Sequence, residues 1–318
     1  MASGGEETTT KSRILVVGGT GYIGKHVVAA SARLGHPTTA LVRDLAPSDP
    51  AKAQLLQSFR DAGVTLLLGD LYDHAGLVEA VRAADVVIST VGALQLADQT
   101  KLIAAIKEAG GNARRFLPSE FGLDVDRTSA VEPAKSVFAV KAGIRRAVEA
   151  EGIPYTYVVP NYFAGYSLPT IGQFLPLAPP VESVVILGDG RTKVVFTEEG
   201  DIGTYTVRAA VDPRAENKTL YIRPAANELS HEELVALWEK KTGKTFKRVH
   251  IPDEDVVKQI QEAAIPTNII LAIAHAAFVR GDMTRDVHPL DPASAVEAIE
   301  LYPDVQYTTV DDYLQRLL

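Results

Sequence analysis

The stretch Arg13-Ile-Leu-Val-Val-Gly-Gly-Thr-Gly-Tyr-Ile-Gly24 decides the fold class of this 318-residue chain. An apolar run at 14–17 predicts a strand, glycines follow it, and residues 22–34 have helical spacing. This order is typical of a dinucleotide site, because glycine lets the backbone approach a pyrophosphate and the helix start offers free N–H groups. The alternative is a glycine turn that only packs. The expected cofactor contacts are Gly18, Gly19, Thr20, Gly21, Tyr22, Ile23 and Gly24.

The end of the next predicted strand, residues 37–42, indicates which nicotinamide cofactor binds. Arg43 follows this strand directly. An NAD site usually has an acidic residue here for the ribose 2′-hydroxyl, whereas an arginine accommodates a 2′-phosphate. Asp44 comes next and weakens the signal, but a guanidinium pairs with phosphate in a fork geometry, so we favour NADPH. Lys52 either adds a second positive charge to this site or is an ordinary solvated lysine.

The composition is that of a globular protein and argues against several classes of partner. The chain is 46% hydrophobic and 23% charged, as expected of one large or two unequal globular domains. A net charge of −8 argues against nucleic acid or an anionic membrane as a partner, and no apolar run is long enough for a membrane span. The chain lacks cysteine, which fits a cytoplasmic protein. Residues 1–12 are small and polar, and we expect a disordered tail there.

Strands and helices continue to alternate as far as residue 159. Strands are expected at 64–68, 85–90, 115–118 and 155–159, and helices at 74–83, 101–109 and 133–151. The alternation predicts an α/β fold with a doubly wound parallel sheet of the Rossmann type. Ligands bind at the carboxyl ends of such strands. Further cofactor contacts are therefore expected at Thr90, Val91, Gly92, Ser119, Glu120, Phe121, Asn161 and Phe163.

The pattern changes beyond about residue 165, where prolines become frequent. Runs at 184–187 and 193–196 flank Asp189-Gly190, a pair that favours a hairpin turn. Helices are expected at 199–210, 231–242, 253–263 and 268–280. We therefore divide the chain into a dinucleotide-binding domain, 13–165, and a smaller mixed α/β substrate lobe, 166–318, and allow the chain to cross back between them.

Lys141 is the candidate catalytic residue. It lies within the apolar stripe of the helix expected at 133–151, whereas most helical lysines are solvated. An ammonium held on an inward face has a lowered pKa, which suits proton transfer near neutral pH. Four residues earlier, Val137 stands where a short-chain dehydrogenase has the tyrosine of Tyr-x-x-x-Lys. The absence of that acid argues against simple ketone reduction.

Three further segments are distinctive beside the glycine motif: Pro118-Ser-Glu-Phe-Gly122, Val140-Lys-Ala-Gly-Ile-Arg-Arg146 and Asn161-Tyr-Phe-Ala-Gly-Tyr166. In these segments, and over nearly its whole length, the chain resembles the plant isoflavone reductase-like family, atypical short-chain reductases of the NmrA type. Within the family, the chain is most similar to the phenylcoumaran benzylic ether reductases. It departs from them at Val159-Pro160, at Ser167 and at 272–278, positions that the resemblance places facing the substrate.

The resemblance implies an NADPH-dependent reductase acting on a small phenolic substrate, a phenylcoumaran or a related lignan. It matches Lys141 to the family's catalytic lysine, Arg43 to its 2′-phosphate arginine with Lys52 as helper, and Arg145 to a cofactor contact. It places Phe163, Tyr166 and His275 near the substrate. The residues alone leave alternatives: Arg145 paired with Glu149 on the surface, His275 as a core residue, and Glu120 as a structural carboxylate paired with arginine or lysine.

The sequence is compatible with other functions. Reduction of pinoresinol and lariciresinol, or of isoflavonoids, would use the same cofactor. A non-catalytic NADPH-sensing protein is the alternative from another class. No His, Asp or Glu cluster has metal-ligand spacing, so no metal is expected. A homodimer is compatible with the sequence but is not indicated by any motif.

Overall fold

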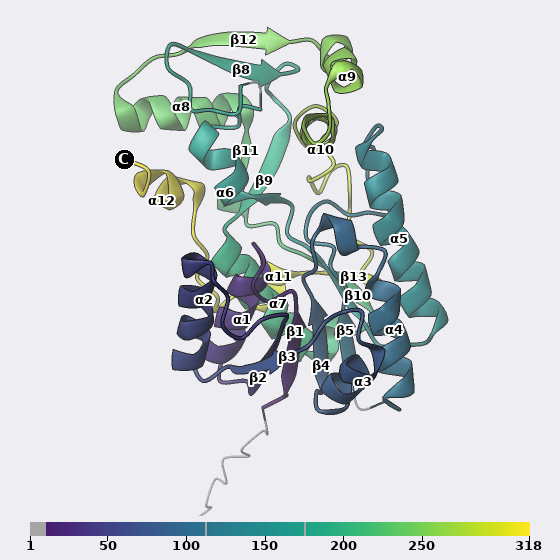
Figure 1. Ribbon diagram of the computed structural model, residues 1–318. Helices are drawn as coiled ribbons and strands as arrows, with labels where there is room; N and C mark the ends of the chain where they lie inside the picture. Colours follow the sequence, from purple (N-terminus) through teal and green to yellow (C-terminus); the bar gives the residue numbers. More distant parts are fainter. Residues whose placement is uncertain (1–10, 112, 175) are drawn as a thin grey trace, which may run out of the picture.

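The structure is a computed structural model and describes residues 11–111, 113–174 and 176–318. The predicted tail, 1–12, therefore lies outside the described residues except for its last two positions. Figure 1 shows a parallel sheet with flanking helices in the lower half and smaller sheets and helices stacked above it. None of the helices in the described ranges is both long and apolar enough to cross a membrane.

The lower half is the predicted Rossmann-type sheet, with strand order β3-β2-β1-β4-β5 and all neighbours parallel. Its strands are β1 (Ile14–Val17), β2 (Thr38–Val42), β3 (Thr65–Leu68), β4 (Val86–Ser89) and β5 (Arg115–Leu117). Successive side chains of a strand point to opposite faces. In β1, Ile14 and Val16 pack into one core and Leu15 and Val17 into another, so the sheet is buried on both faces.

Helices cover both faces of this sheet, as the prediction of a doubly wound fold requires. On one side lie α1 (Gly24–Arg33), α2 (Pro50–Asp61) and α7 (Glu199–Ala210), and on the other α3 (His74–Arg82), α4 (Gln99–Glu108) and α5 (Ala134–Ala150). Helix α2 is absent from the predicted elements. Its start is nevertheless encoded, because Asp49 caps the backbone N–H groups of Ala51 and Lys52 and Pro50 occupies the first turn.

The chain returns to this sheet from beyond residue 166. Strand β6 (Thr156–Val159) lies next to β5 through a bridge between Phe116 and Tyr155. Strands β10 (Lys218–Tyr221) and β13 (Ala295–Glu297) then pair in parallel beyond β6. The short helix α11 (Ala298–Leu301) follows β13. Strands from beyond residue 166 thus lie beside the parallel sheet of the lower half.

The upper half contains two small sheets. Strands β7 (Tyr162–Phe163), β9 (Lys193–Thr197) and β11 (Glu228–Ser230) form one, and β8 (Ser183–Leu187) and β12 (Lys247–Ile251) form the other. The predicted hairpin is thus wrong in its pairing, although both strands exist. The turn between β8 and β9 forms hydrogen bonds with later segments: the Gly188 amide donates to Ile251 O, and the Gly190 carbonyl accepts from Glu232 N.

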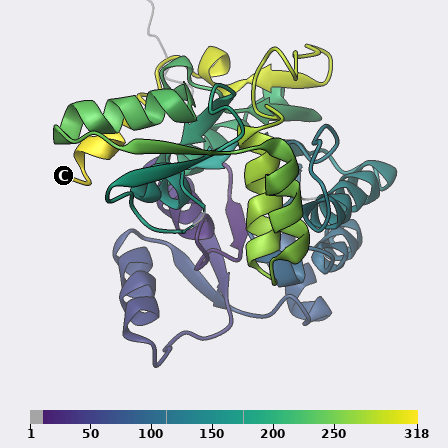
Figure 2. The same cartoon turned by 90° about the horizontal axis from the view of Figure 1, so that it is seen from above.

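The remaining helices enclose this half and are α6 (Ala164–Ser167), α8 (His231–Thr242), α9 (Asp253–Glu262), α10 (Thr267–Phe278) and α12 (Val310–Gln315). Figure 2 shows α10 beside α5, so a helix of the upper half lies next to the helix that carries Lys141. The hydrophobic core of the upper half is rich in aromatic rings that contact one another, including Tyr162, Phe174, Phe196 and Phe278.

Candidate active site

The glycine-rich turn packs tightly against the carboxyl end of β4. Gly18 has φ +83°, and a Cβ there would lie 2.6 Å from the Thr90 carbonyl oxygen. A Cβ at Gly24 would clash with the Gly18 carbonyl oxygen. The Thr90 hydroxyl donates to Val17 O at 3.0 Å and joins the two strand ends, which brings the loop at 90–92 beside the turn. These positions therefore require glycine.

The start of α1 suits a pyrophosphate. Its N-cap residue, Ile23, forms no side-chain hydrogen bond to the helix, and the first turn contains no acidic residue. The amide groups at this end therefore lack a side-chain partner, and the dipole there favours an anion. Thr20 and Tyr22 are exposed beside this helix end.

Arg43 and Lys52 lie at the end of β2 and in the first turn of α2. Both side chains are exposed, and neither has a hydrogen bond or ion pair with another of the described residues. Two free cations beyond the strand that follows the glycine motif form a suitable site for a 2′-phosphate. The residues present therefore fit NADPH.

A cavity of about 450 Å³ lies between the two halves of the molecule. Five predicted site residues line it: Phe121, Lys141, Asn161, Phe163 and Tyr166. Most of the other lining side chains are apolar and were not predicted from the sequence: Leu123, Phe138, Tyr162, Phe174, Leu177, Ile270 and Ile273. An apolar cavity with a few polar groups is the usual form of a small-molecule site.

Among the described residues that line this cavity, Lys141 is the one cation. Its Nζ donates a hydrogen bond to the Glu120 carbonyl oxygen at 2.5 Å and lies 5.8 Å from the centre of the Phe138 ring. Burial is the main cause that lowers the pKa of Lys141 to about 8; the Glu120 carboxylate opposes this shift, and the Arg145 charge contributes to it. A sizeable fraction of Lys141 is therefore neutral near physiological pH and able to accept a proton.

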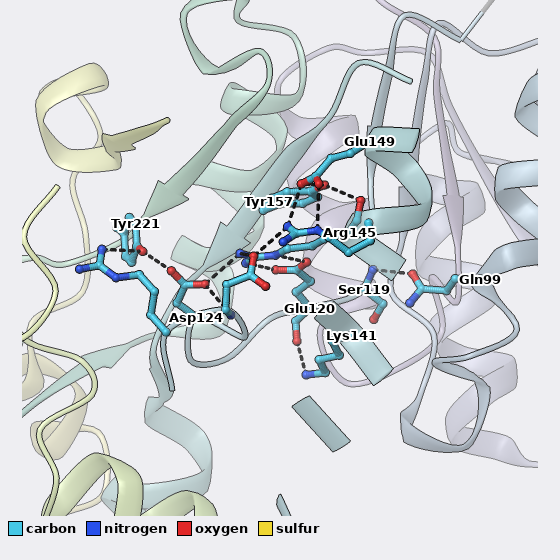
Figure 3. Close-up of polar contacts among 12 residues, drawn as sticks. Gln99, Ser119, Glu120, Asp124, Lys141, Arg145, Glu149, Tyr157 and Tyr221 are labelled. Atoms are coloured by element: carbon cyan, nitrogen blue, oxygen red, sulfur yellow. Dashed lines mark hydrogen bonds and ion pairs between the residues drawn. The ribbon is translucent and has the colours of Figure 1, made fainter. Parts of the chain in front are cut away.

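Arg145 lies in a buried ion cluster behind the cavity, shown in Figure 3. Its Nε and Nη2 donate to the two carboxylate oxygens of Glu120, at 2.7 and 2.5 Å. Its Nη1 donates to Asp124 and Asp126, at 2.9 and 3.0 Å. The guanidinium also stacks on Tyr157, 4.5 Å from the ring centre. We name Glu120, Asp124, Asp126, Arg145 and Tyr157 the Arg145 cluster.

The geometry of the Arg145 cluster differs from two expectations for Arg145, the surface pair with Glu149 and the cofactor contact. The surface pair between Arg145 and Glu149 is wrong, because Glu149 pairs with the neighbouring Arg146 at 2.8 Å. Arg145 is only 2% exposed and does not line the cavity, since three carboxylates hold it behind the wall. Glu120 is buried by the same contacts, and burial raises its pKa against the lowering effect of Arg145. The Glu120 carboxylate is therefore paired with an arginine, as one of the two alternatives for this residue predicted.

Ser119 and Asn161 are also held by buried contacts. The Ser119 hydroxyl donates to Val91 O at 2.9 Å, and the Ser119 amide donates to Gln99. The Asn161 amide side chain donates to Ile222 O at 3.0 Å, and the residue has φ +65°. These contacts position the ends of β4, β5 and β6 around one edge of the sheet, where the cofactor contacts were expected.

Three aromatic rings connect the glycine turn with the cavity. Tyr22 stacks on Tyr166 with ring centres 4.4 Å apart, and Phe163 lies 6.0 Å from Tyr22. The Tyr22 hydroxyl donates to Glu199 Oε1 at 2.6 Å, and the Gly165 amide donates to the same oxygen at 2.9 Å. Sequence reasoning missed Glu199, because its partners come from two segments far away in the chain. Phe163 and Tyr166 are thus brought together with the cofactor turn.

His275 is not brought to the cavity. It is fully buried on α10, and its Nε2 lies 2.7 Å from Asp253 Oδ1. The same helix contributes Ile270 and Ile273 to the cavity wall instead. The placement is that of a core histidine with one polar partner, so no substrate contact by His275 follows from this geometry. Among the described residues, no group of three or more His and acidic side chains could hold a metal ion.

The family model described as the NmrA-like family matches residues 10–314. The chain belongs to this family. It is 70% identical to an isoflavone reductase homolog from Zea mays, over 97% of this chain and 99% of the relative. It is 62% identical to eugenol synthase 1 from Petunia hybrida, over 96% and 98%. It is 61% identical to phenylcoumaran benzylic ether reductase Pyrc5 from Pyrus communis, over 97% and 99%.

Solved structures of the family superimpose closely on this chain. A crystal structure of isoflavone reductase has a TM-score of 0.92 at 48% identity and covers 97% of this chain and 100% of that one. The binary complex of leucoanthocyanidin reductase with NADPH from Vitis vinifera has a TM-score of 0.89 at 34% identity, with 96% and 99% covered. The Rossmann-type fold and the family resemblance are therefore confirmed.

Proposed function

We propose that this NmrA-like protein is an NADPH-dependent reductase that opens the benzylic ether of phenylcoumarans such as dehydrodiconiferyl alcohol. The observation that carries the proposal is Lys141, a lysine of lowered pKa on the wall of an apolar cavity. The named relatives are reductases and related enzymes, and the chain is an oxidoreductase of the same family.

NADPH is the cofactor that the site fits. The uncapped start of α1 and the glycine turn would hold its pyrophosphate, and Arg43 with Lys52 would hold its 2′-phosphate. A family neighbour is solved as a complex with NADPH. When bound, NADPH supplies the hydride that the benzylic carbon of the substrate accepts.

Lys141 supplies the proton transfer that makes this carbon electrophilic. A phenylcoumaran with a free para-hydroxyl loses its phenolic proton to the neutral amine. The phenoxide electrons then move through the ring and form the quinone methide, while the benzylic carbon–oxygen bond breaks and its electrons stay on the oxygen. That oxygen leaves as a second phenoxide and takes up the proton from the Lys141 ammonium. Once the benzylic carbon has accepted its hydride, the para-oxygen is a phenoxide again and takes up a proton from water. A phenol of pKa about 10 and an amine of pKa about 8 make the first step uphill by only about 3 kcal/mol.

This route explains two features of the site. No acid is needed to protonate a carbonyl oxygen, so Val137 is compatible with catalysis although it stands at the position of the usual tyrosine. The remaining task is to hold two aromatic rings in place, and the apolar wall with Phe163 and Tyr166 suits that task.

The substrate is tested with a panel of compounds and NADPH. The panel contains dehydrodiconiferyl alcohol, pinoresinol, an isoflavone and a 4-hydroxycinnamyl ester. The ester is included because loss of its acyloxy group from a para-hydroxylated ring would give a similar quinone methide. We expect the highest kcat/KM with dehydrodiconiferyl alcohol. A higher value with another member would overturn the proposed substrate, and NADPH binding without any turnover would favour the sensing alternative.

The matched variants are Lys141→Ala and Lys135→Ala, which lie on the same helix. Lys135 is exposed and outside the cavity. Lys141→Ala is expected to lower kcat by about 10²- to 10⁴-fold with NADPH affinity little changed, and Lys135→Ala to leave both unchanged. Full activity of Lys141→Ala would contradict the mechanism.

A further inference from the structure

One short segment, residues 120–124, forms both a wall of the cavity and part of the Arg145 cluster. Its middle residues, Phe121, Gly122 and Leu123, line the cavity. Its two end residues, Glu120 and Asp124, turn their carboxylates to the opposite side, where both accept hydrogen bonds from Arg145. One buried guanidinium thus holds both ends of a segment whose middle faces the substrate site.

The same segment carries the hydrogen-bond acceptor of Lys141. The backbone carbonyl of Glu120 accepts from Lys141 Nζ, while the side chain of Glu120 lies in the fork of Arg145. The next residue, Phe121, has φ +37°, a backbone conformation that side chains other than glycine rarely adopt. Such a conformation persists only where the surroundings over-determine it, and the contacts at the two ends of the segment do so here.

Further contacts fix the guanidinium itself. Tyr157 lies against its face, and the Tyr157 hydroxyl donates to the Arg145 carbonyl oxygen at 3.2 Å. Asp124 also accepts a hydrogen bond from the Tyr221 hydroxyl on β10 (Figure 3). A buried ion cluster is weak evidence for stability, because desolvation offsets the attraction between its charges. A fixed geometry is therefore the better explanation of what this cluster contributes.

We propose that Arg145 is a positioning residue for the proton transfer. It touches neither the cavity nor the turn at 18–24, and it acts by holding the segment 120–124 so that the Glu120 carbonyl oxygen directs the Lys141 amine into the cavity. The inference rests on the proposed function, because it assigns Arg145 a role only through the lysine that handles the proton.

A double-mutant cycle between Arg145 and Lys141 tests this proposal. Arg145→Lys keeps the positive charge but loses the two-pronged contact with Glu120. Turnover is measured with NADPH and dehydrodiconiferyl alcohol. It is expressed per NADPH-binding site, so that unfolded protein does not lower the apparent kcat. We expect Arg145→Lys alone to lower kcat by 10- to 100-fold, with the NADPH Kd changed less than threefold. When Arg145→Lys is added to Lys141→Ala, we expect kcat of the double variant to be less than threefold below that of Lys141→Ala alone.

The outcomes are distinguishable. Losses that multiply in the double variant, or wild-type kcat in Arg145→Lys, would overturn the positioning role. Full activity of Lys141→Ala would instead refute the proposed mechanism, whatever Arg145 does. Should Arg145→Lys fail to fold, Glu120→Gln takes its place in the cycle, because it keeps the backbone carbonyl and weakens the fork from the other side. Arg146→Gln is the matched control: it shares Asp126 with Arg145 but is exposed, and we expect wild-type kcat from it.

Discussion

Replacement of Lys141 by methionine is expected to stabilise the protein in a pH-dependent manner. Burial lowers the pKa of Lys141 from its usual 10.5 to about 8, so the folded state disfavours the protonated amine. The resulting penalty is fully present below about pH 8 and is lost as the pH rises towards 10.5. At pH 6.5 it amounts to about 3 kcal/mol, and at pH 9.5 to about 1.4 kcal/mol.

Methionine removes this penalty but leaves the Glu120 carbonyl oxygen without its donor, which costs about 1 kcal/mol. Lys141→Met is therefore expected to be about 2 kcal/mol more stable than the wild type at pH 6.5 and nearly equal to it at pH 9.5. Urea denaturation at both pH values measures the difference, with Lys135→Met on the exposed side of α5 as the control. A variant that is less stable at pH 6.5, or whose gain does not change with pH, would refute the lowered pKa.

Three further predictions concern the cofactor and the reaction. The kcat/KM is expected to rise with pH through a midpoint near 8, because Lys141 accepts the phenolic proton only when neutral; a rate profile that is flat from pH 6 to 9.5 would contradict this role. Arg43→Glu should weaken NADPH by at least 100-fold, about 3 kcal/mol, and NADH by much less, whereas equal weakening in a titration of both cofactors would argue against a 2′-phosphate site. Tyr166→Ala removes the ring stacked on Tyr22 and should raise the KM for the phenolic substrate about tenfold with little change in the Kd for NADPH, measured by fluorescence titration; an unchanged KM would exclude Tyr166 from the substrate site.

The first half of the fold could be predicted because its signals are local. Strand β1 is apolar at every position, since each of its faces packs into a core, and the glycine turn and α1 follow it directly. The pairing of β8 and β9 could not be predicted in this way. The Asp189-Gly190 turn favours a hairpin, but β12, some sixty residues later, pairs with β8 instead. The spacing of apolar residues within a strand does not indicate which distant strand it pairs with.

In the candidate site, too, residues with a local signal could be predicted and contacts between separate segments could not. Lys141 could be found because its neighbours on the apolar stripe of α5 indicate an inward face. The environment of Arg145 could not, because its acidic partners precede the helix, in a loop whose course the helical spacing does not describe. The position of His275 could not be predicted for a similar reason: its partner Asp253 belongs to another helix, and only the packing of α9 on α10 shows which side of α10 the histidine occupies.

The most direct test of the account compares dehydrodiconiferyl alcohol with its para-O-methyl ether as substrates of the wild-type enzyme and NADPH. The two compounds differ only in whether Lys141 has a phenolic proton to remove. We expect reduction of the free phenol, with oxidation of NADPH in equal amount, and no reduction of the methyl ether. Reduction of the methyl ether at a similar rate would contradict proton removal by Lys141 as the step that starts the reaction, because no quinone methide can form from the ether.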